Sequence, residues 1–248
     1  MNIAIIGYGR MGHEIERIAG DRGINVVSII DPNNKDAPFD EINKESMKNV
    51  DVCIDFTVPE SAVENVKKAA KFKKNIVMAT TGWYGSIDKV KKIVKDANIG
   101  FIWSGNFSLG VNIFFRIIEN AARIMNNADM YDLFAYEIHH NQKKDSPSGT
   151  AKMIGDILIR NINRKERLVT ERLDRKIELD EIHFASIRGG NVPGTHAVCF
   201  DSAADTIELK HTARGREGFA LGAVMAAEWI YRKKGFFDIN DLMKEVIK

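Results

Sequence analysis

The segment Asn2-Ile-Ala-Ile-Ile-Gly-Tyr-Gly-Arg-Met-Gly12 decides the fold of the first part of the chain. Its apolar run Asn2–Ile6 predicts a buried strand, and a helical pattern begins at the glycines that follow. The spacing Gly-x-Gly-x-x-Gly between a strand and a helix is the fingerprint of a dinucleotide-binding βαβ unit. Gly7 permits the tight turn, Gly9 lets backbone N–H groups approach a pyrophosphate, and Gly12 lets the helix pack closely on the strand. We therefore predict that the N-terminus of this helix holds phosphates.

Asp31 ends the second predicted strand, about 20 residues beyond the glycines, where a ribose-binding acid is expected. A carboxylate at this place accepts hydrogen bonds from a ribose diol and repels a 2′-phosphate, which favours NADH over NADPH. Arg10 and Lys35 could soften this preference because each could attract that phosphate. We expect NADH to be preferred and NADPH tolerated. The alternative is an ordinary strand–turn–helix in which Asp31 is a turn residue or a cap.

The following segments repeat the alternation of short apolar runs with helical patterns. Continuous Val/Ile runs separated by helices indicate a parallel sheet covered on both faces. Right-handed crossovers then make it a Rossmann-type, doubly wound sheet of the α/β class. The further strands are expected at Ile24–Ile30, Val52–Phe56, Ile76–Ala79 and Gly100–Trp103, and the helices at Met11–Ala19, Glu60–Lys71 and Ile87–Asp96.

Two loops that are rich in glycine and small hydroxyl side chains follow the fourth and fifth predicted strands. Ligands of open α/β sheets bind at the carboxyl ends of the strands, so these loops are candidates to line a nicotinamide and its ribose. The alternative is that both are plain turns. Their candidate residues are Thr80, Thr81, Gly82, Ser104, Gly105, Asn106 and Phe107.

The pattern changes after Asn106, where strands joined by tight turns indicate a second α+β domain on a mixed or antiparallel sheet. Its first helix is expected over residues 111–126, with Ile113, Ile117, Ala121 and Ile124 on one stripe. The chain should close with two helices. The other expected elements are strands Tyr131–His140, Ile182–Arg188, Thr195–Asp201 and Thr206–Thr212 and helices Thr150–Ile162, Phe219–Tyr231 and Ile239–Ile247.

The composition excludes several classes of protein. The chain has 248 residues, 44% of them hydrophobic, and a net charge of +2 at pH 7. It is therefore expected to fold, and it lacks the strongly basic balance typical of nucleic-acid binding. No apolar run approaches the ~18 residues of a membrane span, and Met1 leads directly into a strand, so we expect no membrane segment and no signal peptide. Two cysteines cannot form a disulfide scaffold, which favours a cytoplasmic protein.

The densest group of polar residues is Glu137-Ile-His-His-Asn-Gln-Lys-Lys-Asp-Ser-Pro-Ser-Gly-Thr-Ala151. On an extended strand His139 and His140 point to opposite faces, so a shared role requires the strand to end there. Ser148 begins a typical helix N-terminus, whose backbone N–H groups form a nest for an anion such as a carboxylate. Lys143, on the loop between, could supply a cation or a proton. The segment therefore predicts a site that holds an anionic substrate beside an acid.

Three other interpretations of this segment compete with the first. Glu137, His139 and perhaps His183 could ligate a metal, but no HExxH or Cys/His spacing supports it, so no metal is predicted. The histidines could also belong to a hydrated surface loop. A Ser–His–Asp hydrolase would need a Gly-x-Ser-x-Gly elbow, which the sequence lacks.

The segment Glu137–Ala151 resembles the signature of the dihydrodipicolinate reductase family, also named 4-hydroxy-tetrahydrodipicolinate reductases, of bacterial lysine and diaminopimelate biosynthesis. The resemblance covers nearly the whole chain. The chain departs from the family pattern in the shorter spacing of its first glycines, at Ala79, at Ser104-Gly105 and at Ser146. The other matching motifs are Arg10-Met-Gly12, Thr80-Thr-Gly82, Asn106-Phe-Ser-Leu-Gly-Val-Asn112, Ser186-Ile-Arg-Gly-Gly190, Gly194-Thr-His196 and Phe219-Ala-Leu-Gly-Ala-Val224.

The resemblance implies NAD(P)H-dependent reduction of 4-hydroxy-tetrahydrodipicolinate, a cyclic dicarboxylate, to tetrahydrodipicolinate. It makes His139 the catalytic histidine, as a proton donor or acceptor, and Lys143 a lysine proton donor, so that either of the two delivers the proton. His140, Gly149 and Thr150 match substrate contacts. It implies a homotetramer formed through residues 108–216, and a dinucleotide domain of residues 1–107 that helices in 217–248 complete. The implied cofactor residues are Gly7, Gly9, Arg10, Met11, Gly12, Asp31, Thr80–Gly82 and Ser104–Phe107.

Two alternatives to this function remain at the level of the sequence. One is another imine- or amino-acid-directed NAD(P) dehydrogenase, such as an aspartate dehydrogenase-like enzyme. The other is a nucleotide sensor without catalytic activity, which would need the glycine fingerprint but not His139, Lys143 and the Ser148–Thr150 turn together.

Overall fold

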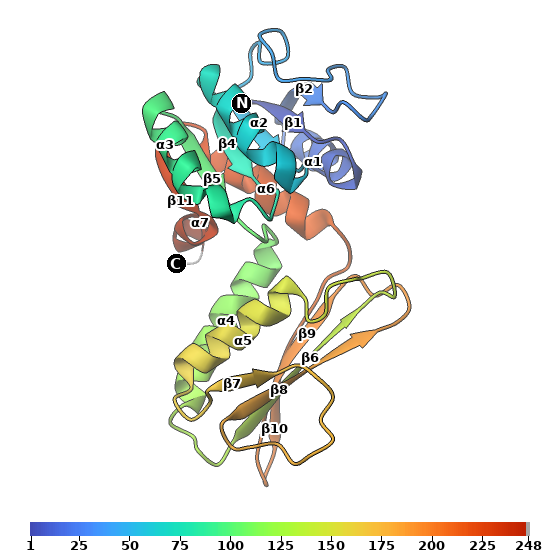
Figure 1. Cartoon of the computed structure of the whole chain (residues 1–248), viewed down its shortest axis with the longest axis vertical. Helices are drawn as coiled ribbons and strands as arrows, with labels where there is room; N and C mark the ends of the chain where they lie inside the picture. The colour runs from blue at the N-terminus through green and yellow to red at the C-terminus, as the bar shows by residue number, and fades with distance from the viewer. Residues whose placement is uncertain (247–248) are drawn as a thin grey trace. The chain divides into compact units, whose positions relative to one another are not determined.

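The computed structural model describes residues 1–246, which form two compact units (Figure 1). The first unit comprises Met1–Leu109 and the residues from Arg216 onward, and the second comprises Gly110–Gly215. The helix predicted at Ile239–Ile247 is present, but its last residue, Ile247, lies outside the described residues. In the part of the chain that is described, no helix has the length and apolar character that crossing a membrane requires.

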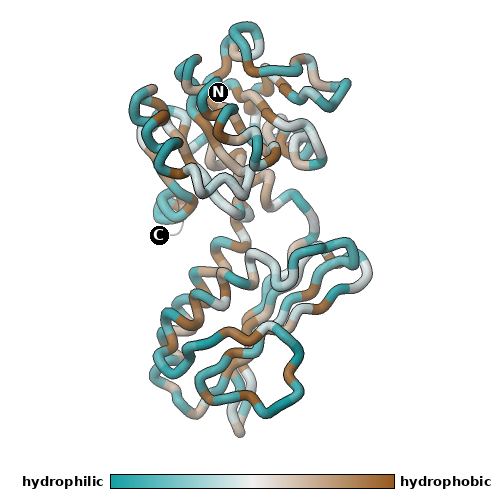
Figure 2. The backbone as a smooth tube through the Cα atoms, in the orientation of Figure 1, coloured by the Kyte–Doolittle hydropathy of each residue, from teal (hydrophilic) through white to brown (hydrophobic). Residues whose placement is uncertain are grey.

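The first unit is built on a six-stranded parallel sheet, as the alternating pattern predicted. The strand order β11-β5-β4-β3-β1-β2 places β1, with its glycine turn, between β3 and β2. Every pairing in this sheet is parallel, and Figure 2 shows hydrophobic stretches running through it. The strands are β1 (Asn2–Ile6), β2 (Asn25–Ile30), β3 (Val52–Asp55), β4 (Asn75–Met78), β5 (Gly100–Trp103) and β11 (Gly235–Asp238).

Helices cover both faces of this sheet. On one face α1 and α6 contact each other, and on the other α2 and α3 do so (Figure 1). Since α6 comes from the end of the chain, the C-terminal segment completes the unit whose sheet begins at residue 2. The helices are α1 (Arg10–Asp21), α2 (Pro59–Lys71), α3 (Ile87–Ala97), α6 (Glu217–Ile230) and α7 (Ile239–Val246), with a short 3-10 turn η1 at Tyr84–Ser86.

The second unit is a five-stranded mixed sheet with the order β10-β9-β6-β8-β7, packed against two helices. Strand β9 is antiparallel to β6 and β10, whereas β8 is parallel to β6 and β7. The mixed sheet predicted from the sequence is therefore confirmed. Its elements are α4 (Leu109–Met125), β6 (Asp132–His139), α5 (Gly149–Asn161), β7 (Arg167–Val169), β8 (Glu181–Arg188), β9 (Thr195–Asp201) and β10 (Thr206–Thr212).

The stripe that predicted α4 is not the side of the helix that faces the core. Ile117 is 47% exposed and Ile124 is 69% exposed. The buried side carries Phe114 and Phe115 together with Ile118, since α4 has apolar residues on more than one side and the bulky aromatic rings bury more surface. Periodicity therefore identified the helix but not its orientation.

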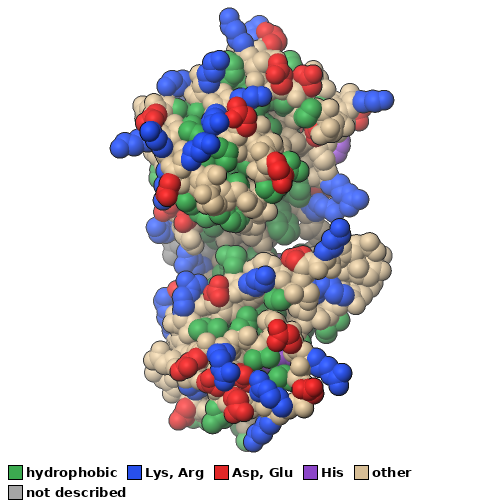
Figure 3. All heavy atoms as spheres, in the orientation of Figure 1, with side chains coloured by type: hydrophobic (Ala, Val, Ile, Leu, Met, Phe, Trp, Pro, Cys, Tyr) green, Lys and Arg blue, Asp and Glu red, His purple; other side chains and the backbone are tan. Residues whose placement is uncertain are grey.

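Charged side chains of both signs are mixed on one face of the molecule (Figure 3). On the face drawn in Figure 3, Lys and Arg lie among Asp and Glu over both units, consistent with the nearly balanced charge of the chain. This distribution differs from the one-signed basic surface that binding to a nucleic-acid backbone usually requires.

Candidate active site

The glycine loop between β1 and α1 has the close contacts that its sequence predicted. Gly7 has a φ of +92°, and a Cβ there would lie 2.3 Å from the Phe56 carbonyl oxygen. A Cβ on Gly12 would lie 2.6 Å from the Gly7 carbonyl oxygen, so helix and turn pack too closely for a side chain. A Cβ on Gly9, the N-cap residue of α1, would meet open space. Gly7 and Gly12 are thus required by the close packing of the turn. Gly9 leaves room in front of the helix N-terminus, where an anion is favoured.

A pocket of about 420 Å³ adjoins this loop within the first unit. Asp31 lines it and accepts hydrogen bonds from Tyr8 N–H and Asn33 N–H, each at 2.8 Å. Asp40 and Glu41 also line the pocket, as does Lys68 on α2. Acidic groups therefore outnumber basic ones at this wall.

The two cations that could attract a 2′-phosphate, Arg10 and Lys35, are both exposed. Met11 follows Arg10 in the first turn of α1 and is half-buried. Both residues stand at the N-terminus of the helix that follows the glycine turn.

The two predicted nicotinamide-side loops divide into buried supports and exposed positions. Thr80 Oγ1 donates to Asp55 Oδ1 at 2.7 Å and accepts from Thr57 N–H at 2.7 Å. Ser104 Oγ is likewise engaged within its own loop, donating to the Asn106 carbonyl at 2.7 Å. The Phe107 ring is buried. The exposed positions of these loops are Thr81, Gly82 and Gly105.

Asp55 is a loop support that the sequence interpretation missed. It is fully buried at the end of β3, and burial raises the pKa of its carboxyl group. Hydrogen bonds from Thr57, Thr80 and Asn65 oppose that effect. A lone acid at the end of the apolar run Val52–Asp55 was the available signal.

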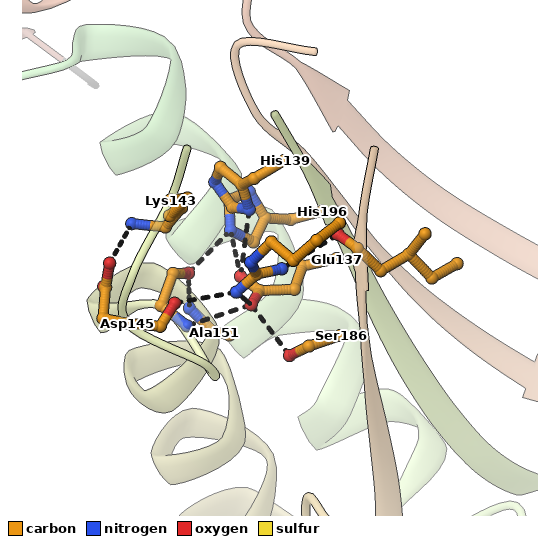
Figure 4. A network of polar contacts seen from close by, with 10 residues as sticks. Glu137, His139, Lys143, Asp145, Ala151, Ser186 and His196 are labelled. Carbon is orange, nitrogen blue, oxygen red and sulfur yellow. Dashed lines mark hydrogen bonds and ion pairs between the residues drawn. The ribbon is translucent and has the colours of Figure 1, made fainter. Parts of the chain in front are cut away.

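In the second unit, β6 ends at His139, as a shared role for the histidine pair required. The His139 ring is buried and meets His196 of β9 edge to face, with 5.1 Å between ring centroids (Figure 4). His140 is half-buried, and its backbone N–H donates to the Val192 carbonyl at 2.8 Å. The two histidines therefore have different surroundings, and only His139 lies in the buried group.

Glu137, two residues before His139, is the centre of this group (Figure 4). Its Oε1 accepts from Ser148 N–H at 3.0 Å, Ser186 Oγ at 2.8 Å and Arg188 Nη2 at 2.7 Å. Its Oε2 lies 3.4 Å from both His139 Nδ1 and His196 Nε2. Burial alone would raise the pKa of Glu137, but these donors lower it well below its ordinary value. The carboxylate is therefore ionised at neutral pH.

Burial also sets the protonation of His139. Desolvation lowers the pKa of its imidazole to about 4, and the nearby carboxylate of Glu137 only partly opposes this effect. The ring is consequently neutral at pH 7.

The loop of residues 140–148 carries the other predicted acid. Lys143 Nζ donates to Asp145 Oδ1 at 2.6 Å, and Arg188 Nη2 donates to the Asp145 carbonyl at 2.8 Å. The loop is thus attached through Asp145 to the end of β8.

Helix α5 begins at Gly149, one residue before the predicted start at Thr150. Ser148 is its N-cap residue, and Ser148 Oγ accepts from Ala151 N–H at 3.1 Å. Gly149 is exposed, and a Cβ built on it would meet nothing within 4 Å. Thr150 follows in the first turn and is half-buried. The helix N-terminus therefore has an open side, where a helix favours negative charge.

The ligand atoms of Glu137, His139 and His196 all lie within 4.8 Å of one another, close enough to surround a cation. The sequence also suggested His183 for such a set. In the sheet, His183 lies opposite Phe134 of β6, three positions before Glu137, and it is not part of this group. Arg188 already neutralises the carboxylate, so a divalent ion would bring uncompensated charge into a buried site. This arrangement favours an organic site over a metal centre.

Sequence reasoning assigned no role to His196, Ser186, Arg188 or Asp145. The first three lie in motifs that match the family, Ser186-Ile-Arg-Gly-Gly190 and Gly194-Thr-His196, which were the available signal. Their convergence on Glu137 depends on how β6, β8 and β9 align, and single-sequence patterns do not specify that alignment.

Two family models and several curated proteins match the chain. Residues 1–107 match the family model "Dihydrodipicolinate reductase, N-terminus", and residues 110–243 match "Dihydrodipicolinate reductase, C-terminus". The chain is 40% identical to a 4-hydroxy-tetrahydrodipicolinate reductase of Christiangramia forsetii, over 100% of both chains. It is 38% identical to the reductase of that name from Archaeoglobus fulgidus, over 98% of this chain and 100% of the other.

A similar fold is found in a solved structure, the dipicolinate-bound dihydrodipicolinate reductase from Paenisporosarcina sp. TG-14. The TM-score is 0.78 at 20% identity, and the match covers 97% of this chain and 98% of that one. By its two family models and its full-length relatives, the chain belongs to the dihydrodipicolinate reductase family.

Proposed function

We propose that the chain catalyses the NAD(P)H-dependent reduction of 4-hydroxy-tetrahydrodipicolinate to tetrahydrodipicolinate, in lysine and diaminopimelate biosynthesis. The observation that carries the proposal is the capped, open N-terminus of α5 beside Lys143 and the buried His139, in a chain that also has a dinucleotide loop. Two full-length relatives, 40% and 38% identical to the chain, bear the name of that activity.

The N-terminus of α5 is the proposed binding place for a substrate carboxylate. Gly149 and Thr150 stand in the first turn of α5, and the N-terminal end of a helix favours negative charge. The open space beside Gly149 leaves a planar ring room to approach. His140 and Lys143 would add positive or polar groups on the same loop. An anionic dicarboxylate fits this set better than a neutral substrate.

The reduction needs a proton as well as a hydride. Loss of water from the substrate leaves a conjugated C=C–C=N system, and addition of hydride at its far carbon moves electron density toward the ring nitrogen. The Gly7–Gly12 loop and Asp31 would hold NAD(P)H, which when bound would supply that hydride. The chain must then protonate the electron-rich product, which general acid catalysis accelerates by ~10²–10⁴-fold.

Lys143 is the proposed proton donor. With a pKa of about 4, only roughly one His139 ring in a thousand is cationic at pH 7. The Lys143 ammonium group, oriented by Asp145, carries three N–H donors. His139 then serves as a neutral hydrogen-bonding group at the floor of the substrate site.

NADH is the proposed preferred cofactor. Asp31, Asp40 and Glu41 line the pocket and would repel a 2′-phosphate, against a single lining cation, Lys68. Comparing kcat/KM for the two cofactors tests this proposal, and a large advantage for NADPH would overturn it.

The cellular setting is proposed from the family resemblance and the cysteines. Both Cys53 and Cys199 are free and buried, which fits the reducing cytoplasm. We propose a homotetramer assembled through the second unit. Light scattering on the purified chain tests this assembly, and a monomer at micromolar concentration would contradict it.

A coupled assay tests the proposed reaction. Purified chain and NADH are mixed with the upstream synthase, pyruvate and aspartate semialdehyde, and NADH absorbance is followed. Oxidation should require all components and should be inhibited by pyridine-2,6-dicarboxylate, a planar analogue of the substrate. Oxidation with an unrelated keto acid and ammonia, unaffected by that inhibitor, would favour an amino-acid dehydrogenase instead.

A further inference from the structure

The carboxylate of Glu137 contacts two residues, Ser148 and Arg188, that lead to different parts of the proposed substrate site. The side chain has no exposed surface, and it extends from β6 toward groups from β8, β9 and the N-terminus of α5 (Figure 4). A buried charge of this kind persists only where several donors surround it.

The first connection is to the anion-binding turn. Ser148 N–H donates to Glu137 Oε1, and Ser148 Oγ caps α5 while also lying 3.1 Å from His196 Nε2. The carboxylate thereby fixes the residue that directly precedes Gly149. If Ser148 moved, the first-turn N–H groups would move with it.

The second connection is to the loop that carries the proton donor. Arg188 Nη2 is shared between Glu137 Oε1 at 2.7 Å and the Asp145 carbonyl at 2.8 Å. Asp145 in turn pairs with Lys143. A continuous chain of charge-assisted contacts therefore leads from the buried carboxylate to the ammonium group.

We propose that Glu137 is a positioning residue, whose charge holds the anion-binding turn of α5 and the Lys143 loop in their working places. It touches neither substrate nor cofactor and acts through Ser148 and Arg188. The inference rests on the proposed function, because that function assigns Gly149, Thr150 and Lys143 to the substrate.

Glu137→Gln is the informative substitution, since it keeps the shape of the side chain and removes its charge. Arg188 then loses its counter-ion and Asp145 loses its anchor. A displacement near 1 Å of a reacting group can cost ~10²-fold in rate. We expect kcat to fall by about that factor, and the Kd of pyridine-2,6-dicarboxylate to rise about tenfold or more. The Kd of NADH, measured by fluorescence titration, should stay within about twofold of the wild type.

Glu181→Gln is the matched control. Glu181 lies in the same sheet, is as deeply buried, and pairs with Arg175 at 2.8 Å through both of its oxygens. It stands at the start of β8, at the opposite end of that strand from Arg188. This variant should lose stability while kcat, KM and the inhibitor Kd of the folded fraction remain unchanged.

The combination of readouts separates positioning from stability. A purely structural role would lower only the fraction of active protein, which reduces apparent kcat but leaves KM and the inhibitor Kd unaltered. Glu137→Asp, which keeps the charge, should recover part of the loss. The inference is wrong if Glu137→Gln binds the inhibitor and turns over substrate as the wild type does, or if its Kd values match those of Glu181→Gln. Absence of turnover in the wild type would contradict the proposed function instead. The inhibitor Kd values of the wild type, Glu137→Gln and Glu181→Gln would still decide the role of Glu137.

Discussion

Acidification should destabilise the second unit in a pH range set by the buried His139. The folded-state pKa of this ring is about 4, against roughly 6.5 in an unfolded chain. Between these values the unfolded state binds a proton that the folded state does not. Stability therefore falls as the pH decreases from about 6.5 toward 4, and it changes little above pH 7.

The size of the effect follows from the difference between the two pKa values. From pH 7 to pH 5, the linkage relation assigns a loss of about 2 kcal/mol to this single imidazole. Glu137 adds little in that range, because its lowered pKa makes its contribution disappear only at more acidic pH, below the unfolded value of about 4.3. Burial also lowers the pKa of His211. This histidine adds to the overall dependence of stability on pH, but its contribution does not depend on residue 139.

The measurement must report on the second unit. All three tryptophans, Trp83, Trp103 and Trp229, lie in the first unit, so their fluorescence does not follow it. Amide hydrogen exchange of β6 and β9 at pH 7 and pH 5, corrected for intrinsic rates, gives the opening free energy there. Wild type and His139→Gln are compared. Both contain His211, so its contribution to the pH dependence of the opening free energy cancels in the difference.

The wild type should lose about 2 kcal/mol more than His139→Gln over this range. Equal pH dependence in the two proteins would show that His139 titrates normally. In that case the choice of Lys143 over His139 as the proton donor would lose its support, because that choice depends on the lowered pKa of His139.

Three further outcomes are expected. Lys143→Met should lower kcat by ~10²–10⁴-fold while leaving the Kd of NADH unchanged; a comparable loss of NADH affinity would place this residue at the nucleotide site or in the fold. Gly149→Val should raise KM about tenfold or more by filling the approach to the α5 N-terminus, with an unchanged unfolding midpoint because no atom lies within 4 Å of its Cβ position; an unaltered KM would exclude that turn from substrate binding. Asp31→Ser should raise the ratio of kcat/KM for NADPH over NADH about tenfold by removing the charge repulsion, and an unchanged ratio would show that Asp31 does not face the 2′ position.

Local patterns predicted most of the fold because most strands and helices of the first unit satisfy their own periodicity. The buried run Asn2–Ile6 and the glycines after it need no knowledge of distant residues. The four-residue strand β11, Gly235–Asp238, went unpredicted because its only apolar side chains are two phenylalanines, and it lies at the edge of the sheet, paired with β5. Strand β7 is shorter still and is likewise paired, with β8.

In the candidate site too, features set by neighbouring residues were predictable, and contacts between distant strands were not. Ser148 as a helix cap and the end of β6 at His139 follow from neighbouring residues. The contacts of Glu137 with Arg188 and His196 join three strands, and their register depends on the whole sheet. Exposure likewise could not be assigned from composition: Thr80 and Ser104 look like ligand-facing hydroxyls in the sequence, but both are buried in loop hydrogen bonds.

Direct transfer of a hydride onto the bound ring is the step on which this account depends. Reaction of the coupled substrate mixture with NADH deuterated at nicotinamide C4, on the face that is transferred, tests it in one measurement. Mass spectrometry and NMR of tetrahydrodipicolinate should find one deuterium at the ring carbon distal to the C=N group, with the second new hydrogen derived from solvent. Product that lacks the label, or label that appears only in water, would contradict the proposed reduction.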